Sequence, residues 1–396
     1  MREETAATRT RGRTILPAGE KRGMKYVLQI FTGSWNEAGG SPEEIIRKIR
    51  EIASRIPVDK VIIGWSTDPA LYREVGSFLH ARGMRMLLWL PVFSEAGRTA
   101  GADAALDLFG KPVPPPALQD GEGFIFYCPS SRRNRRIVTD LYETCFSGCG
   151  FDGVFLDRIR SQSFLSGVSG VLSCGCERCR KAFLEKGVDP DAVAKRYKQE
   201  KDAFFDMASF PMNGRFVLKD GPAQRFFDAK EEIFAEAATE LSGYFRNRGL
   251  IVGLDLFAPL VSRFVGQNYA LLSRCADFIK PMLYLRTDAP AGIGYEYALF
   301  EKHAPGARGR IRISPDAALL ESQLAALREV PCEQDPGIEI NYDRDLVRTD
   351  AGYITESLAA IRGRGFERAA LCWNILQAPA ALLDAVYAGE DGRPGR

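Results

Sequence analysis

Histidine is nearly missing from this sequence. Only His80 and His303 occur among 396 residues, which argues against a histidine-rich metal site or a histidine-based catalytic triad. A strong net charge is also missing, because 53 basic and 51 acidic residues leave a balance of +2. We therefore expect neither nucleic acid nor a membrane surface as a partner. No apolar run approaches the roughly 18 residues that a membrane-spanning helix needs.

The N-terminus lacks the apolar stretch of a secretory signal. Residues 1–23 are polar and rich in arginine, so we expect a disordered leader there, a folded domain over 24–389 and a loose tail over 390–396. The expected location is cytoplasmic. In such a reducing compartment, grouping among the nine cysteines indicates a metal site more than disulfides.

Short apolar segments alternate with helical patterns along the chain. Eight segments read as buried strands, at 26–31, 61–65, 85–90, 153–156, 250–254, 278–283, 338–340 and 369–372. Helical patterns occupy 42–54, 69–81, 133–144, 223–246, 314–328, 350–362 and 378–387. Eight such units predict a parallel sheet closed into a (β/α)₈ TIM barrel. The alternative is a doubly wound open sheet, but no G-x-G-x-x-G motif follows the first strand.

Local signals support these boundaries. Ser41-Pro42-Glu43-Glu44 has the cap, first-turn proline and acids of a helix start. Gly83, Gly249 and Gly365 each stand just after a helical pattern and just before a strand, as αβ connections require. Two long insertions, 95–126 and 161–222, follow the third and fourth strands and should shape a cleft at the carboxyl ends of the strands.

Carboxylates and aromatic side chains gather at these strand ends. The run 150–160 places Asp157 and Arg158 directly after the apolar Val154–Leu156 segment, where a parallel barrel carries its chemistry. All four tryptophans, Trp35, Trp65, Trp89 and Trp373, fall at such ends. Aromatic rings surrounded by carboxylates are typical of a carbohydrate site, so we expect these tryptophans to line sugar subsites.

Cleavage of a glycosidic bond needs two carboxyl groups beside that bond. Asp157 is one candidate, and Glu339 and Asp255 are the candidates for its partner. With Glu339, Asp157 would be the acid/base and Glu339 the nucleophile. With Asp255, Asp157 would be the nucleophile and Asp255 the acid.

Further polar residues at the strand ends are candidates for binding substrate. Arg158, Arg286 and Lys280 could hold a carboxylate ionised or could bind an anionic sugar. Tyr284 could hydrogen-bond the nucleophile, and Asn341 also lies at a strand end.

Three cysteines lie within six residues, in Cys174-Gly175-Cys176-Glu177-Arg178-Cys179. A structural zinc site takes four thiolate ligands in a tetrahedron, and Cys128 is the best fourth ligand. Zinc would then tie the two insertions together. Free thiols or an iron–sulfur cluster are the alternatives, and Cys145 and Cys149 could compete as ligands.

Four segments of the chain follow one another as they do in TIM-barrel glycoside hydrolases. They are 150–160, 253–257, Val265-Gly266-Gln267 and 277–284. From Met24 onwards the chain resembles these proteins, which implies carbohydrate-active chemistry at Asp157. Lys280 precedes the Pro-Met pair where the family more often has a small residue.

The C-x-C-x₂-C run with Cys128 upstream is similar to the zinc cluster of the family 42 β-galactosidases. The similarity implies Cys128, Cys174, Cys176 and Cys179 as zinc ligands. It also implies catalytic acids at strands four and seven, where Asp157 and Glu339 stand. That family uses two glutamates, whereas this chain has an aspartate at the first position and no Asn-Glu pair before the cysteines.

We therefore predict a TIM-barrel glycosidase that acts on an oligo- or polysaccharide through a pair of carboxyl groups, with a structural zinc and no catalytic cofactor. A carbohydrate-binding barrel without catalysis is one alternative, and a lyase or aldolase of the same fold is another. The sugar, the linkage and the oligomeric state do not follow from the sequence.

Overall fold

A computed structural model describes residues 23–33, 40–94, 101–115, 124–209, 215–305 and 313–391. The expected leader lies outside these residues except for Gly23, and Trp35 lies outside them as well. The last helix, α14 (Ala380–Asp391), extends past the expected start of the tail at residue 390. Within it, Glu390 accepts a hydrogen bond of 2.9 Å from the Tyr26 hydroxyl.

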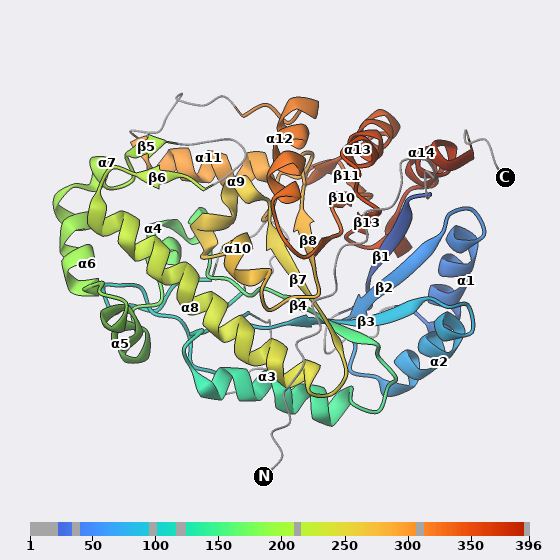
Figure 1. The fold of residues 1–396 in the computed structure, drawn as a ribbon, viewed down its shortest axis with the longest axis horizontal. Helices are drawn as coiled ribbons and strands as arrows, with labels where there is room; N and C mark the ends of the chain where they lie inside the picture. The colour runs from blue at the N-terminus through green and yellow to red at the C-terminus, as the bar shows by residue number, and fades with distance from the viewer. Residues whose placement is uncertain are drawn as a thin grey trace, which may run out of the picture.

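Eight parallel strands close into a barrel, as the alternation of segments predicted. Pairing runs in chain order, and the register between Gly337 and Met282 completes the ring. Figure 1 shows the strands at the centre of the molecule and the helices around them. The barrel strands are β1 (Lys25–Phe31), β2 (Val58–Gly64), β3 (Arg85–Pro91), β4 (Gly153–Asp157), β7 (Ile251–Phe257), β8 (Phe278–Met282), β10 (Gly337–Glu339) and β13 (Arg368–Cys372).

Helices cover the outside of the barrel. The long ones are α1 (Pro42–Ala53), α2 (Pro69–His80), α3 (Arg132–Cys145), α8 (Gly221–Arg246), α11 (Ile293–His303), α12 (Ala317–Arg328), α13 (Ala351–Gly363) and α14. Ser41 and Glu44 form the capping box that starts α1. Gly83, Gly249 and Gly365 have φ values of +71°, +78° and +74°, so each turn into a strand uses the left-handed conformation that glycine favours.

The sequence did not predict α11. Its first turn contains Gly294, which weakens helix propensity, and the segment directly follows an irregular connection at 283–292. No single helix follows β7; α9 (Pro259–Ser262), the 3₁₀ turn η2 (Arg263–Val265) and α10 (Tyr269–Leu272) stand there in short pieces. Within the described ranges, no helix is long and apolar enough to cross a membrane.

The insertion after β4 is more ordered than the one helical piece that the sequence indicated. It contains the 3₁₀ turn η1 (Phe164–Ser166), α4 (Gly167–Val171), α5 (Glu177–Glu185), α6 (Pro190–Gln199), α7 (Lys201–Phe204) and a hairpin of β5 (Met207–Ser209) and β6 (Val217–Leu218). Figure 1 shows α5 and α6 beside the first half of α8. This insertion therefore packs on the outer helix layer.

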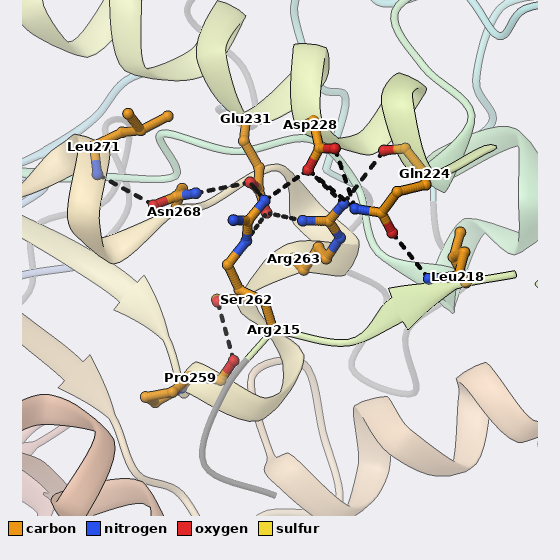
Figure 2. Close-up of polar contacts among 10 residues, drawn as sticks. All are labelled: Arg215, Leu218, Gln224, Asp228, Glu231, Pro259, Ser262, Arg263, Asn268 and Leu271. Carbon is orange, nitrogen blue, oxygen red and sulfur yellow. Dashed lines mark hydrogen bonds and ion pairs between the residues drawn. The ribbon is translucent and has the colours of Figure 1, made fainter. Parts of the chain in front are cut away.

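A buried ion-pair network fastens the insertion and η2 to α8. Arg263 and Glu231 are each 1% exposed, and Arg263 donates to Glu231 at 3.2 Å and to Asp228 at 2.8 Å. Arg215, from the hairpin, contacts the same two acids at 2.5 and 2.8 Å. Asn268 adds a hydrogen bond of 2.8 Å to Glu231. Figure 2 shows the guanidinium groups of Arg263 and Arg215 beside the carboxyl groups of Asp228 and Glu231.

Removing one partner from this network should destabilise the fold. Arg263→Met leaves the Glu231 carboxylate buried with less compensation, so we expect the free energy of unfolding to fall by about 3–5 kcal/mol in urea denaturation. Arg225→Met, at an exposed position of α8, should change it by less than about 0.5 kcal/mol. The double variant Arg263→Met/Glu231→Gln should recover part of the loss. Equal effects of the two single variants would contradict this role of the network.

Candidate active site

A cavity of about 330 Å³ opens at the carboxyl ends of the barrel strands. Seven of the eight strands, or the residues just after them, contribute to its wall. The lining residues are Gln29, Phe31, Trp65, Trp89, Phe124, Phe126, Asp157, Arg158, Arg160, Gln162, Ser163, Leu165, Ser166, Asp255, Phe257, Met282, Tyr284, Pro290, Ala291 and Trp373. The cavity therefore lies where a barrel enzyme carries its active site.

Backbone strain concentrates at this cavity. Trp65, Arg158 and Ala291 have φ values of 88°, 55° and 72°, and they are the non-glycine residues with positive φ in the described ranges. All three line the cavity. Such conformations cost of order 1–3 kcal/mol each and tend to cluster at functional sites. The strain marks the cavity independently of its chemistry.

Asp157 is held at the end of β4 by two N–H donors. Trp89 Nε1 donates to Oδ2 at 3.0 Å, and the backbone N–H of Arg158 donates to Oδ1 at 2.6 Å. The side chain is nearly buried, at 8% exposure of the residue, but it reaches the cavity. Both donors offer hydrogen bonds that an ionised carboxylate accepts.

Asp255, on the neighbouring strand β7, has a different environment. Burial raises the pKa of its carboxyl group to about 7, the charge of Asp157 adds to this rise, and Lys280 opposes it. The Lys280 ammonium lies 3.1 Å from Oδ2, while Oδ1 is buried without a hydrogen-bond partner in the described residues. The two acids thus share one cavity but differ in their surroundings, because both oxygens of Asp157 accept hydrogen bonds whereas Oδ1 of Asp255 has no partner among the described residues.

Lys280 is itself completely buried inside the barrel. Its ammonium donates to Gln29 Oε1 and to the Tyr284 hydroxyl, each at 3.0 Å. The Tyr284 hydroxyl that could have met the nucleophile therefore contacts Lys280. Tyr284 still lines the cavity, as predicted from its strand end.

Glu339 does not line the cavity, unlike Asp157 and Asp255. Its Oε1 accepts from the backbone N–H of Arg286 at 2.7 Å and from Thr287 Oγ1 at 3.0 Å. Its Oε2 accepts from the Tyr353 hydroxyl. Because Glu339 lies outside the cavity that Asp157 and Asp255 share, the geometry favours Asp255 as the partner of Asp157.

Two other candidate substrate ligands, Arg286 and Asn341, do not line the cavity either. Arg286 is not among the lining residues, and its guanidinium lies 5.5 Å from the Tyr353 ring centre. Asn341 Oδ1 accepts from the backbone N–H groups of Trp373 and Asn374, at 2.8 and 3.0 Å. Asn341 thus positions the segment that carries Trp373, and it does not reach the cavity itself.

Aromatic rings form much of the cavity wall. Trp65 and Trp89 pack edge to face at 5.8 Å between ring centres, and Phe31 lies 5.3 Å from Trp65. Across the cavity mouth, Trp373 packs against Tyr284 at 5.9 Å. The structure therefore brings three of the four tryptophans to the cavity.

Several lining residues were not assigned a role from the sequence. Phe124 and Phe126 come from the end of the insertion after β3, while Gln162, Ser163, Leu165 and Ser166 begin the insertion after β4. Arg160 lies within the run that carries Asp157, and its two-residue offset from Arg158 was the available signal. Loops that fold over a barrel mouth have no periodicity from which such contacts could be predicted.

The four predicted cysteine ligands come together outside this cavity. The sulfur atoms of Cys128, Cys174, Cys176 and Cys179 all lie within 4.8 Å of one another. Cys128 Sγ is 3.3 Å from Cys176 Sγ and 3.4 Å from Cys179 Sγ. Cys128 precedes α3, whereas the other three lie at or near the start of α5. The cluster can bind a metal ion and would then join the two insertions.

Cys145 and Cys149 do not belong to this cluster. The Cys149 thiol instead donates to the carbonyl oxygen of Cys145 at 3.4 Å, within the loop that ends α3. The expected competition for the metal site is therefore not seen among the described residues.

The raised pKa of Asp255 gives a test by protein stability. In the native state the carboxyl group holds its proton up to about pH 7, whereas in the unfolded chain it ionises near its usual value. Its contribution is thus fully present below that usual value and is lost as the pH rises through about 7. Relative to Asp255→Asn, the free energy of unfolding of the wild type should fall by up to about 4 kcal/mol between pH 4 and pH 8. A difference that is constant over this range would show that Lys280 keeps Asp255 ionised throughout.

Comparison with known proteins relates the chain to others by fold alone. No protein-family profile and no curated protein sequence matches it. Its structure is similar to the PgaB (BpsB) glycoside hydrolase domain from Bordetella bronchiseptica, at 15% identity and a TM-score of 0.59, over 92% of this chain and 98% of that one. Alpha-L-fucosidase isoenzyme 2 from Paenibacillus thiaminolyticus matches at 11% identity and a TM-score of 0.50, over 93% of this chain and 49% of that one. A class V chitinase from Pseudomonas fluorescens Pf-5 matches at 10% identity and a TM-score of 0.47, over 92% of this chain and 99% of that one. The closed parallel barrel and the similarity to the PgaB domain show that the chain has a TIM-barrel fold that is also found in a glycoside hydrolase domain.

Proposed function

We propose that the chain is a glycoside hydrolase whose catalytic groups are Asp157 and Asp255. One observation carries the proposal: two acids from neighbouring strands line one cavity, one with N–H donors on both oxygens and the other with a pKa raised to about 7. Glycosidic cleavage needs such a pair, in which one carboxyl group is protonated and the other is ionised.

In the proposed reaction, Asp255 is the general acid. It donates its proton to the oxygen of the leaving group as the glycosidic bond breaks. The Asp157 carboxylate attacks the anomeric carbon and forms a glycosyl ester. Water, deprotonated by the Asp255 carboxylate, then attacks the same carbon, which frees Asp157 and returns the proton to Asp255.

The wall of the cavity suits a sugar ring. Trp65, Trp89 and Trp373 offer apolar faces, and Gln29, Gln162 and Ser163 offer polar groups beside them. This mixture of aromatic surface and a few placed polar groups is typical of small-molecule sites. The fold shared with the PgaB glycoside hydrolase domain supports the proposal by analogy.

The pH dependence of kcat/KM on an aryl glycoside tests the two roles. Activity requires protonated Asp255, so kcat/KM should fall as the pH rises through about 7. Asp157→Asn and Asp255→Asn should each lower kcat/KM for substrates with poor leaving groups by about 10²-fold or more. Glu339→Gln is the matched control, because it changes a buried acid outside the cavity. A Glu339→Gln enzyme that is inactive yet retains the wild-type Tm, beside active Asp255→Asn, would contradict the assignment.

We also propose that the four-cysteine cluster holds a structural zinc ion. Four thiolates are the ligand set of a closed zinc site, in which sulfur atoms about 2.3 Å from the metal stand about 3.8 Å apart. The mutual distances of the four sulfur atoms, all within 4.8 Å, suit that geometry. The similarity to the zinc cluster of the family 42 β-galactosidases agrees with this proposal. The ion would tie the loop before α3 to α5, and it would take no part in bond cleavage.

Metal analysis tests the zinc site. Purified protein should contain one zinc per chain by mass spectrometry of the metal, and a strong chelator should lower its Tm. Cys176→Ser should lose most of the zinc, whereas Cys145→Ser, which changes a thiol outside the cluster, should keep it. Visible absorption with bound iron, or equal zinc in both variants, would refute the proposal.

A further inference from the structure

Two arginines form one charged side of the cavity, and each is stacked on aromatic rings. The Arg158 guanidinium lies 3.8 Å from the ring centre of Phe124 and 4.7 Å from that of Trp65. The Arg160 guanidinium lies 4.4 Å from the ring centre of Phe257 and 4.8 Å from that of Phe126. Such stacking limits the movement of a guanidinium and leaves its N–H edge available to a ligand.

Arg160 has no carboxylate at ion-pair distance in the described part of the chain. Its Nη1 donates a hydrogen bond of 3.0 Å to the carbonyl oxygen of Ser161. Burial lowers the pKa of Arg160 to about 10, and the more distant carboxyl groups of Glu296, Asp157 and Asp255 partly oppose this shift. Arg160 is half-buried, and a cation that has lost part of its hydration is normally compensated by a close anion. A ligand in the cavity could supply that anion.

An unused acceptor lies on the same side of the cavity. Gln162 is 3% exposed, and its Nε2 donates to the carbonyl oxygens of Pro114 and Phe124 at 3.3 Å each. Its Oε1 is buried without a partner among the residues that the structure describes. A sugar hydroxyl could donate to this oxygen while an anionic group on the same sugar meets Arg160.

We propose that the cavity binds a sugar that carries an oxyanion, either the carboxylate of a uronic acid or a sulfate ester, with Arg160 as its main ligand and Arg158 as the second. This inference rests on the proposed glycosidase function, because it names the substrate class of the same site. The planar guanidinium fork pairs with carboxylate or sulfate oxygens through two parallel hydrogen bonds.

A neutral sugar of the same configuration should be a poorer substrate, because it leaves the Arg160 cation desolvated and unpaired. Loss of a hydrogen bond to a charged group changes affinity by about 10- to 100-fold. We therefore expect kcat/KM for an anionic aryl glycoside to exceed that for its neutral counterpart by at least about tenfold.

The experiment measures this preference on matched pairs. Aryl glucuronides and galacturonides, and 6-sulfated aryl glucosides and galactosides, are compared with the neutral glycosides in both anomeric forms. Binding of free glucuronic acid, galacturonic acid and the 6-sulfated sugars is followed by calorimetry. The uronic acid and sulfate arms distinguish the two sources of the oxyanion. In Arg160→Gln, the ratio of kcat/KM for the anionic to the neutral substrate should fall at least tenfold, and binding of the free anionic sugar should weaken similarly.

Arg82→Gln is the matched control, because Arg82 also stacks on an aromatic ring, 4.0 Å from the centre of Phe78, but lies outside the cavity. It should keep the wild-type ratio. If the wild type cleaves neutral glycosides as well as anionic ones, and Arg160→Gln leaves the ratio unchanged, the inference is wrong and the glycosidase function stands. If anionic sugars bind in an Arg160-dependent way but no glycoside is cleaved, the binding inference stands and the proposed catalysis is wrong. Absence of both anionic binding and anionic turnover overturns the inference.

Discussion

The desolvation of the Asp255 carboxyl group is the constraint on which the proposed chemistry of this barrel depends. A closed ring of strands keeps bulk water from the base of the cavity, so a charge there is costly unless a partner lies nearby. Lys280 supplies that partner to one oxygen only. Gln29, on β1, and Tyr284 hold the Lys280 ammonium in place, so residues from across the barrel control the charge of one acid.

Three buried acids lie near the carboxyl ends of the barrel strands, and their surroundings differ. Glu339 is fully buried outside the cavity and accepts hydrogen bonds from Arg286, Thr287 and Tyr353 within the fold. Asp157 is oriented by two donors but still faces the cavity, and Asp255 has one oxygen without a partner in the described residues. Burial alone does not distinguish these groups. Access to the cavity does, because Asp157 and Asp255 line it and Glu339 does not.

The sequence predicted the barrel well because its signals are local. Apolar segments, capped helix starts and glycines before strands each depend on a few neighbouring residues. The same local signals placed Asp157, Asp255 and three of the tryptophans at or near the carboxyl ends of strands, while Trp35 lies outside the described residues. The choice between Asp255 and Glu339 could not be made in this way. It depends on Tyr353, which α13 brings to Glu339, and on Lys280, which contacts Asp255 from the neighbouring strand β8. Arg160 lies only three residues after Asp157 in the sequence, but its stacking depends on Phe126 and Phe257, which come together only in the folded chain.

The division of labour between the two aspartates can be measured directly through the leaving group of an aryl glycoside. A 2,4-dinitrophenyl glycoside departs without protonation, whereas a methylumbelliferyl or alkyl glycoside needs an acid. We expect Asp255→Asn to keep most of the wild-type kcat/KM on the dinitrophenyl substrate and to lose kcat/KM on the poorer leaving groups, while Asp157→Asn is impaired on both. The kcat of Asp255→Asn should fall even on the dinitrophenyl substrate, because hydrolysis of the glycosyl ester then lacks a general base. An Asp255→Asn enzyme whose kcat/KM falls equally on every leaving group would contradict the assignment of Asp255 as the acid.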